Sequence, residues 1–145
     1  MDNYNERRRN SALRYSNNLK GINNITTPNI PNDPQSHVFH QYTLRISDSK
    51  RDLLAEYLTK NSIPFGIYYP VPLHKQKAYY SHEVDNKLFP VTNNAVREVI
   101  SLPMHTELSI EQIDYITEKI IKFLNRLELH GKKQMSMDQS YLCLL

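Results

Sequence analysis

The stretch FGIYYPVPLHKQ, residues 65–76, is the most informative part of this sequence. The β-forming residues around its first half predict a strand from Ile63 to Tyr69. Pro70 and Pro72 end that strand, because proline has no backbone N–H to offer to a neighbouring strand. Prolines at a strand exit also fix the path of the chain, so that side chains near the exit are held at low entropy cost.

Three side chains at this exit are candidates for binding a ligand. They are Tyr68, Tyr69 and His74, which we expect to be polar and partly exposed. Tyrosines that pack into the fold and a histidine on a surface loop would explain the same residues. The stretch alone therefore leaves both interpretations open.

Upstream of this stretch, the residue pattern predicts a helix, a loop, a strand and a second helix. Residues 1–20 form a helix with a thin apolar stripe, and prolines among several asparagines make residues 21–36 a connecting loop. From His37 to Ile46 the residues alternate with period two, which predicts the clearest strand of the chain. Ser49 and Asp52 then resemble a capping box that starts the next helix.

Downstream, residues 73–88 have no clear period, which predicts a loop with a helical turn. We expect Thr92 to cap a short helix, followed by a third short strand. Ser109 and Gln112 form a second capping-box pattern, and the apolar stripe behind them makes the last helix the best supported of all. Residues 131–145 show no period, so we expect a disordered or loosely docked tail.

These elements indicate an α+β fold. Their order is helix, strand, helix, strand, loop, helix, short strand, helix. A small sheet with helices packed mainly on one face would bury the apolar stripes. The length of 145 residues suits one domain with one core.

Composition and charge exclude several classes of function. Lys and Arg number 18 and Asp and Glu 15, so the net charge of +3 is too small to indicate nucleic-acid binding. The basic cluster at residues 7–9 fits a solvated helix face or an interface better than a phosphate site. No stretch reaches the ~20 apolar residues of a membrane span, and no signal peptide follows Met1. The single Cys143 excludes an internal disulfide, which fits a reducing compartment. We therefore expect a cytoplasmic protein, and the lack of a long apolar stretch predicts no membrane partner.

Metal binding and nucleophilic catalysis find little support in the sequence. The closest histidines, His37 and His40, would point to opposite faces of a strand, and no H-E-x-x-H helix occurs. The other histidines are His74, His82, His105 and His130. No G-x-S-x-G elbow is present. We predict no metal site and no catalytic residue in this chain.

Several motifs, in order, resemble those of the DegT/DnrJ/StrS aminotransferases. Tyr68 to Gln76 resembles the family signature YPxPLHxQ, and Arg51-Asp52-Leu53 resembles the start of RDxLxxxLxxxxI. Phe89-Pro90-Val91-Thr92 and Ser101-Leu102-Pro103-Met104-His105 resemble the run FPVTE…LSLPMHP. Further likenesses are Asn5-Glu6-Arg7-Arg8, His40-Gln41-Tyr42 and Gln112-Ile113. This ordered set covers residues 2–128 and is far more specific than a single motif.

The resemblance implies the C-terminal small domain of a pyridoxal-phosphate-dependent enzyme of the aspartate aminotransferase fold, spanning residues 1–130. Such enzymes are homodimers that transfer an amino group, typically from L-glutamate, to a keto sugar attached to a nucleotide. The cofactor is the electron sink, and the protein supplies the Schiff-base lysine and the orientation. By resemblance, Tyr68, Tyr69 and His74 belong to a loop that closes over the sugar substrate.

The resemblance also places the Schiff-base lysine, the acid at the pyridinium nitrogen and most phosphate contacts in the N-terminal domain. The 10 lysines of this chain stand in no matching motif. We therefore expect this chain alone to bind no pyridoxal phosphate and to be inactive. His40 and Tyr42 are expected to be packing or domain-boundary residues.

Three interpretations of the function remain open at this stage. The chain is a truncated or split aminotransferase domain in the first interpretation. In the second it is a non-catalytic partner, paired with a separate cofactor domain or another aminotransferase subunit, with residues 7–9 in the interface. In the third it is an independent module that binds a nucleotide sugar.

Overall fold

A computed structural model describes the backbone of residues 1–79 and 86–142, and the side chains of residues 1–33, 35–79 and 87–129. The side chains of His82, His130 and Cys143, considered above, lie outside the described set.

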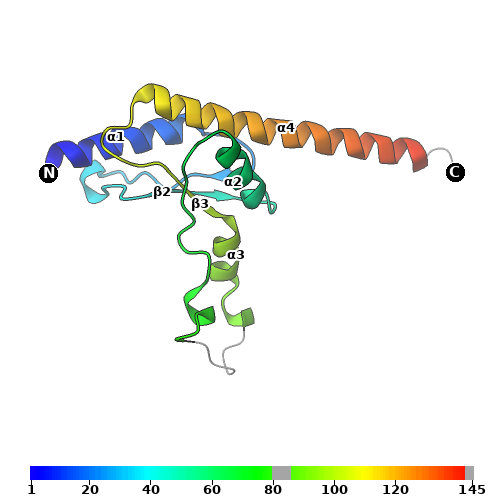
Figure 1. Cartoon of the computed structure of the whole chain (residues 1–145), viewed down its shortest axis with the longest axis horizontal. Coiled ribbons are helices and arrows are strands. Elements are labelled where there is room, and N and C mark those ends of the chain that lie inside the picture. Colours follow the sequence, from blue (N-terminus) through cyan, green and yellow to red (C-terminus); the bar gives the residue numbers. More distant parts are fainter. Residues whose placement is uncertain (80–85, 143–145) are drawn as a thin grey trace.

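The core is built on a three-stranded antiparallel sheet with the strand order β1-β2-β3 (Figure 1). The strands are β1 (Ile25–Thr26), β2 (Tyr42–Ile46) and β3 (Val99–Leu102). In the central strand β2, Tyr42, Leu44 and Ile46 are buried, while the residues between them lie on the more open face. Leu44 pairs with Ile100 of β3, so the two strands bury apolar side chains at the same level.

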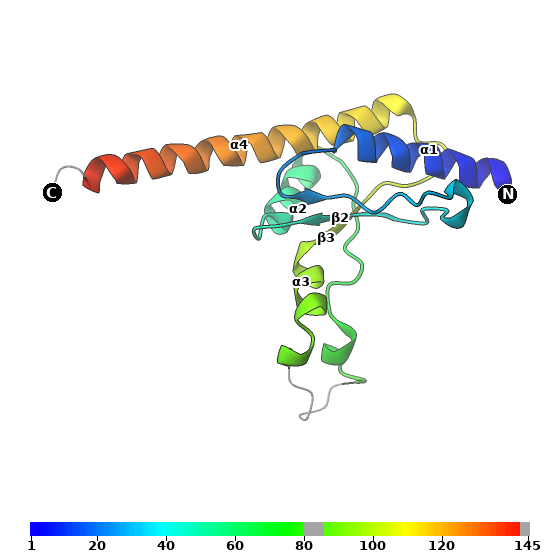
Figure 2. The same ribbon diagram turned by 180° about the vertical axis from the view of Figure 1, so that it is seen from behind.

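Three helices pack against the buried face of this sheet. They are α1 (Asp2–Asn18), α2 (Arg51–Lys60) and α4 (Ile110–Leu142). Helices α1 and α4 run side by side (Figures 1 and 2). Their contribution to the core consists of Ala12, Tyr15, Leu54, Leu58, Ile113, Ile116, Ile120, Phe123 and Leu124, and Leu19, directly after α1, joins them. The α+β class predicted from the sequence is confirmed.

Polar contacts complete the attachment of the thin apolar stripe of α1 to α4. Arg14 donates two hydrogen bonds to the carboxylate of Asp114, from Nε at 2.8 Å and from Nη2 at 2.7 Å. Asn18 donates to the same carboxylate at 2.8 Å and to Thr117 Oγ1 at 3.0 Å. Helix α4 therefore supplies polar partners as well as apolar contacts to α1, whose own apolar stripe is thin.

These donors lower the pKa of Asp114 to about 2, chiefly through the hydrogen bond from Arg14 and then through that from Asn18. A carboxyl with a lower pKa in the folded state adds stability above its unfolded pKa, near 3.8, and this is lost as the pH falls towards 2. We expect NMR titration of the side-chain carboxyl carbon to show this low pKa, and Arg14→Gln to raise it. Arg97→Gln, a control in α3, should leave it unchanged. An ordinary Asp114 pKa in the unaltered chain would contradict the pairing.

Two predicted strands are shorter in the structure than the sequence suggests. β2 begins at Tyr42 rather than His37, because Phe39 has a positive φ of 48°. The Phe39 N–H also donates a hydrogen bond to His37 Nδ1 at 2.8 Å, which closes a turn before the strand. The predicted strand from Ile63 to Tyr69 is reduced to a single bridge between Gly66 and β3.

The two predicted capping boxes have different outcomes. The Ser109 N–H donates to Gln112 Oε1 at 2.9 Å and the Gln112 N–H donates to Ser109 Oγ at 3.2 Å, so the second box is confirmed. The first is wrong, because Ser49 has a φ of 56° and α2 has no side-chain cap. Asp52 instead accepts a hydrogen bond from Arg51 Nε at 2.6 Å.

Residues 67–79 and 86–98 form an arm that projects away from the sheet (Figure 1). Its helical segments are η2 (Leu73–Lys75), η3 (Asn86–Leu88) and α3 (Pro90–Glu98). η2 is the helical turn expected within residues 73–88. α3 begins at Pro90 rather than behind the predicted Thr92 cap, because proline suits the first helical position, where no N–H is needed.

Two arginines fasten the base of the arm to the body. Arg51 of α2 donates to the backbone carbonyl oxygens of Val96 at 3.3 Å and Val99 at 3.0 Å, where α3 ends and β3 begins. Arg45 of β2 contacts Glu98 with an N···O distance of 2.6 Å. The arm therefore leaves the sheet in a defined direction.

Helix α4 continues to Leu142, past Gly131, where the sequence analysis expects a disordered or loosely docked tail. Residues 131–142 contain no proline, and one glycine costs a helix only about 1 kcal/mol. The end of α4 extends well beyond the sheet (Figures 1 and 2). In the part of the chain that the structure describes, no helix combines the length and the apolar character needed to cross a membrane.

Candidate functional site

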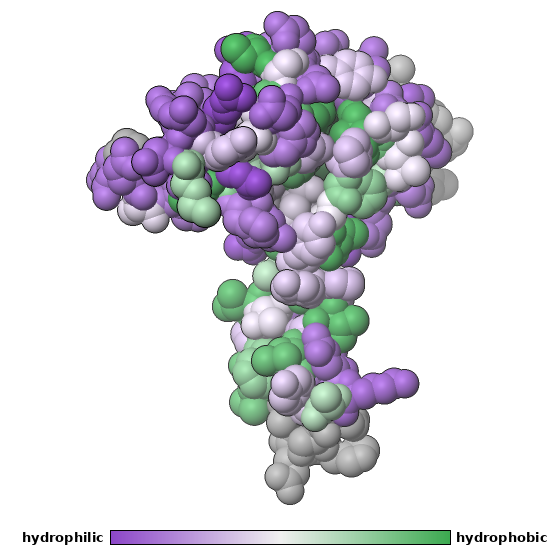
Figure 3. All heavy atoms as spheres, turned by 60° about the vertical axis from the view of Figure 1, so that its left-hand side comes forward, coloured by the Kyte–Doolittle hydropathy of each residue, from purple (hydrophilic) through white to green (hydrophobic). Residues whose placement is uncertain are grey.

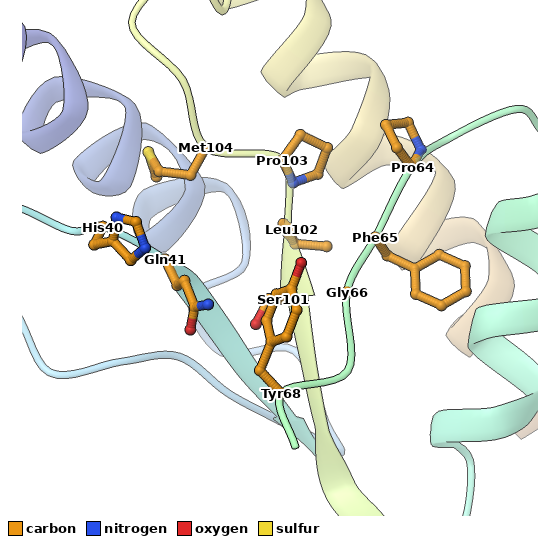
Figure 4. Close-up of a pocket in the computed structure, with 10 residues that line it drawn as sticks. All are labelled: His40, Gln41, Pro64, Phe65, Gly66, Tyr68, Ser101, Leu102, Pro103 and Met104. Atoms are coloured by element: carbon orange, nitrogen blue, oxygen red, sulfur yellow. The ribbon is translucent and has the colours of Figure 1, made fainter. Parts of the chain in front are cut away.

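A cavity of about 340 Å³ lies where β2, β3 and the start of the arm meet (Figure 4). We call it the sheet-edge pocket, and its lining residues are His40, Gln41, Pro64, Phe65, Gly66, Tyr68, Ser101, Leu102, Pro103 and Met104. His40, Gln41 and Met104 lie on one side of the opening (Figure 4). Tyr68 and Ser101 lie on the other, while Phe65 points away. The pocket thus gathers polar groups from three separate segments, and one of them is the predicted contact Tyr68.

The backbone bridge between Gly66 and Ser101 sets the far wall of the sheet-edge pocket. The Gly66 N–H donates to the Ser101 carbonyl at 2.9 Å, and the Ser101 N–H donates to the Gly66 carbonyl at 2.7 Å. The Ser101 hydroxyl lies 2.8 Å from that of Thr43, and Ser101 is buried. Ser101 therefore forms part of the pocket wall, and its backbone and hydroxyl groups are hydrogen-bonded to Gly66 and Thr43.

The ring of Tyr68 lies directly against Gly66. A Cβ atom at position 66 would collide with ring carbons of Tyr68 and come within 2.6 Å of its hydroxyl. The lack of a Cβ at position 66 therefore lets the ring approach the backbone this closely, and the position does not have a left-handed backbone. The ring closes one side of the pocket while the Tyr68 side chain remains about half exposed, at 49%.

His40 and Gln41 belong to the pocket, although the sequence analysis expects His40 to be a packing or domain-boundary residue. Arg8 of α1 donates to the carbonyl oxygens of Phe39 at 3.4 Å and His40 at 3.2 Å, which fixes the turn before β2. Both His40 and Gln41 are exposed at this turn. Their position in the sequence, directly before the central strand β2, is the feature that points to them. Because Tyr42 pairs with Leu102, the last residue of β3, these two residues lie beside the end of β3.

A tyrosine pair from α1 and β2 supports this side of the site. The Tyr15 hydroxyl donates to the Pro103 carbonyl at 3.1 Å, and its ring stacks on that of Tyr42 with a centroid distance of 4.9 Å. Burial raises the pKa of Tyr42 to about 12, so its hydroxyl stays protonated beside Ser16 at 2.7 Å. The pair therefore supports Pro103, which lines the pocket, from within the core.

Tyr69 faces a different opening from Tyr68. A cavity of about 510 Å³ in the arm, which we call the lysine pocket, is lined by Tyr69, Pro70, Val71, Lys75, Gln76 and Lys77. The peptide bond between Tyr68 and Tyr69 is cis, and their rings meet edge to face with centroids 6.1 Å apart. The two tyrosines therefore stand at the boundary between the two pockets.

His74 lies in neither pocket. Its ring stacks on that of Phe89, with centroids 4.5 Å apart and an angle of 20° between the planes. This contact fastens η2 to the residue before α3 inside the arm. The structure thus places Tyr68, Tyr69 and His74 on one arm but in three different surroundings.

The arm exposes an unusual amount of apolar surface (Figure 3). In Figure 3 the narrow lower part is largely hydrophobic, whereas the broad upper part is mostly hydrophilic. The large exposed apolar residues of the arm are Tyr68, Tyr69, Val71, Leu73, Tyr79, Leu88, Phe89 and Val91. Exposed apolar residues gathered in this way mark a surface that normally meets another surface or a ligand.

The residues present do not fit a pyridoxal phosphate site. Such a site needs a lysine for the Schiff base, an acid that pairs with the pyridinium nitrogen on the opposite side of the ring, and a set of phosphate donors. Of the four described cavities, only the lysine pocket contains lysines, and its lining contains no carboxylate. Among the described residues, no group of three or more His, Cys, Asp or Glu is placed to hold a metal ion.

Comparison with known proteins identifies the class of protein. Residues 1–121 match the DegT/DnrJ/EryC1/StrS aminotransferase family. The chain belongs to this family of pyridoxal-phosphate-dependent aminotransferases, as its ordered motifs indicate.

This chain spans about a third of the length of the proteins it resembles. The pleiotropic regulatory protein of Geobacillus stearothermophilus is 37% identical over 85% of this chain, which spans 33% of that protein. The dTDP-3-amino-3,6-dideoxy-alpha-D-galactopyranose transaminase of Aneurinibacillus thermoaerophilus is 34% identical over 85% of this chain and 32% of its own length. The structure of DesV from S. venezuelae, in complex with a ketimine intermediate, superposes with a TM-score of 0.76 at 30% identity, over 85% of this chain and 32% of DesV. The chain therefore corresponds to about a third of an aminotransferase.

Proposed function

We propose that this chain is the C-terminal small domain of a nucleotide-sugar aminotransferase with the aspartate aminotransferase fold. In this function it contributes substrate contacts, and a cofactor-bearing part supplies the lysine and the phosphate contacts. The main support is that the chain matches the family and yet covers only about a third of the length of its relatives. The sheet-edge pocket, which offers polar groups but no lysine–acid pair, agrees with this division of labour.

The arm supports a role in which the chain works together with another part. Its exposed apolar residues have no partner surface within the described body. Burial of apolar surface contributes about 25 cal/mol per Å² removed from water, so an arm of this character gains from docking. The second candidate function is accordingly a non-catalytic subunit that pairs with a separately encoded cofactor domain.

The purified chain mixed with pyridoxal phosphate should show no stable Schiff-base absorption band after dialysis, because no described cavity joins a lysine to an acid. It should also show no transamination with L-glutamate. A chimera in which this chain replaces the matching third of the Aneurinibacillus transaminase should hold the cofactor and transfer the amino group. A stable, stoichiometric cofactor band in the chain alone would contradict the proposal, as would a folded, cofactor-loaded chimera without activity.

A further inference from the structure

The turn that leads into β2 has a backbone conformation that needs support from its surroundings. Phe39 has a φ of 48°, in the left-handed region that large side chains rarely adopt. Its ring is only 3% exposed and belongs to the core. Directly after it come His40 and Gln41, which line one side of the sheet-edge pocket (Figure 4). The conformation of Phe39 therefore sets the direction in which the chain carries these two residues to the pocket.

Two side chains hold the Phe39 turn. The Phe39 N–H donates to His37 Nδ1 at 2.8 Å, within the range of a well-formed hydrogen bond. Arg8 of α1 donates to the carbonyl oxygens of Phe39 at 3.4 Å and His40 at 3.2 Å, and both of these contacts are longer. The rings of His37 and Phe39 also lie close together, with centroids 4.2 Å apart. The bond to His37 is therefore the best-formed polar contact of the turn.

This bond requires a neutral imidazole at His37. Nδ1 accepts the Phe39 N–H with its lone pair, so the ring carries its own proton on Nε2. Protonation turns Nδ1 into a donor, and two N–H groups then face each other where the hydrogen bond was. Histidine is the side chain that most often changes its charge between about pH 5 and 8. The contact that holds the turn therefore depends on the protonation state of His37.

The charged groups around His37 offer no compensation to its protonated form. Arg8, which contacts the turn from α1, adds a like charge. In the loop before His37, the carboxylate of Asp33 accepts the Gln35 N–H at 2.9 Å. The other titratable side chain of the turn is His40, and Arg8 binds its carbonyl oxygen. Among the described residues, no carboxylate forms an ion pair with His37.

We propose that His37 is a positioning residue of the sheet-edge pocket: its neutral form holds the Phe39 turn and so places His40 and Gln41 at the opening, and its protonation releases them. Loss of one hydrogen bond shifts the ratio of closed to open turn about two- to tenfold. Arg8 keeps its charge, so its two longer bonds hold part of the population closed. The turn responds to acid whatever the pocket binds, so the proposed function can fail without it.

NMR of the isotope-labelled full chain tests this role directly. A nitrogen–nitrogen coupling across the hydrogen bond should join the Phe39 amide to His37 Nδ1 at about pH 8 and vanish at about pH 5. The coupling between the amide and Hα protons of Phe39 reports φ, and it should rise towards the value of extended backbone in acid. The amide signals of Phe39 and Gln41 should titrate together with the ring signals of His37.

Three variants separate the acceptor from the charge. His37→Asn is the decisive one, because an asparagine oxygen accepts the N–H two residues on, as in an Asx turn, and does not titrate. It should keep the turn closed at both pH values. His37→Leu offers no acceptor and should show the acid signals of Phe39 and Gln41 already at about pH 8. The matched control His40→Asn removes the other histidine of the turn and should leave the response of Phe39 unchanged.

Three results would overturn the role of His37. One is the absence of the nitrogen–nitrogen coupling at about pH 8. Another is a Phe39 φ that stays positive in acid although the ring signals show that His37 is protonated. The last is an acid response of Phe39 that persists in His37→Asn or disappears in His40→Asn, since either would assign the response to a different group.

Discussion

Replacement of Leu44 by alanine is expected to lower the free energy of unfolding by about 2–5 kcal/mol. Leu44 is fully buried in the central strand, where it pairs with Ile100 and contributes to the core shared by the sheet and the helices. Truncation removes apolar contacts and leaves a cavity that the strands on both sides cannot easily close. Because a domain of this size has a total stability of about 5–15 kcal/mol, this is the largest single effect that we expect.

Urea unfolding followed by far-ultraviolet circular dichroism measures this loss, with the slope of the transition as a check that the folded state is unchanged. Leu129→Ala is the matched control, because Leu129 is 62% exposed on α4 and alanine favours helix. The control should change stability by less than about 0.5 kcal/mol. If both variants lost the same amount, the sheet would not be the centre of the core.

The parts of the fold that follow from sequence are those that depend on neighbouring residues. The Ser109–Gln112 box forms as predicted because both of its hydrogen bonds span three residues of one helix start. The buried alternation of β2 is equally local. Residues 37–41 continue the same alternation, yet the chain turns at Phe39. Arg8, about 30 positions away, fixes that turn, and no local pattern reveals such a contact.

The candidate site shows the same division. The prolines of the stretch from Tyr68 to Gln76 and its resemblance to the family signature indicate a site, and residues of this stretch line two cavities. The other half of the sheet-edge pocket, His40 and Gln41, comes from a segment that meets the arm only through the pairing of β2 with β3. His74 has the motif position of a ligand contact but stacks on Phe89, a pairing across the arm that spacing does not predict.

Gly66 contacts the Tyr68 ring that forms one side of the sheet-edge pocket. The change in the free energy of unfolding caused by Gly66→Ala should therefore test this contact. The new methyl group would collide with the Tyr68 ring, which must move or the bridge to Ser101 must open. We expect a loss of about 1 kcal/mol, at the low end for overpacking, because the colliding atoms are the far end of a half-exposed side chain. Tyr68→Ala alone should cost less, because that side chain is about half exposed, at 49%.

A double-mutant cycle separates the ring from the backbone as the cause of this loss. In the Tyr68→Ala background the Gly66→Ala substitution should be nearly neutral, because the methyl group then occupies the space that the ring has left. Equal losses in both backgrounds would show that the backbone at position 66 resists alanine for its own reasons, and that the ring is not packed against the glycine. Because urea unfolding measures all four variants of the cycle, the coupling energy tests the wall of the pocket without any ligand or cofactor.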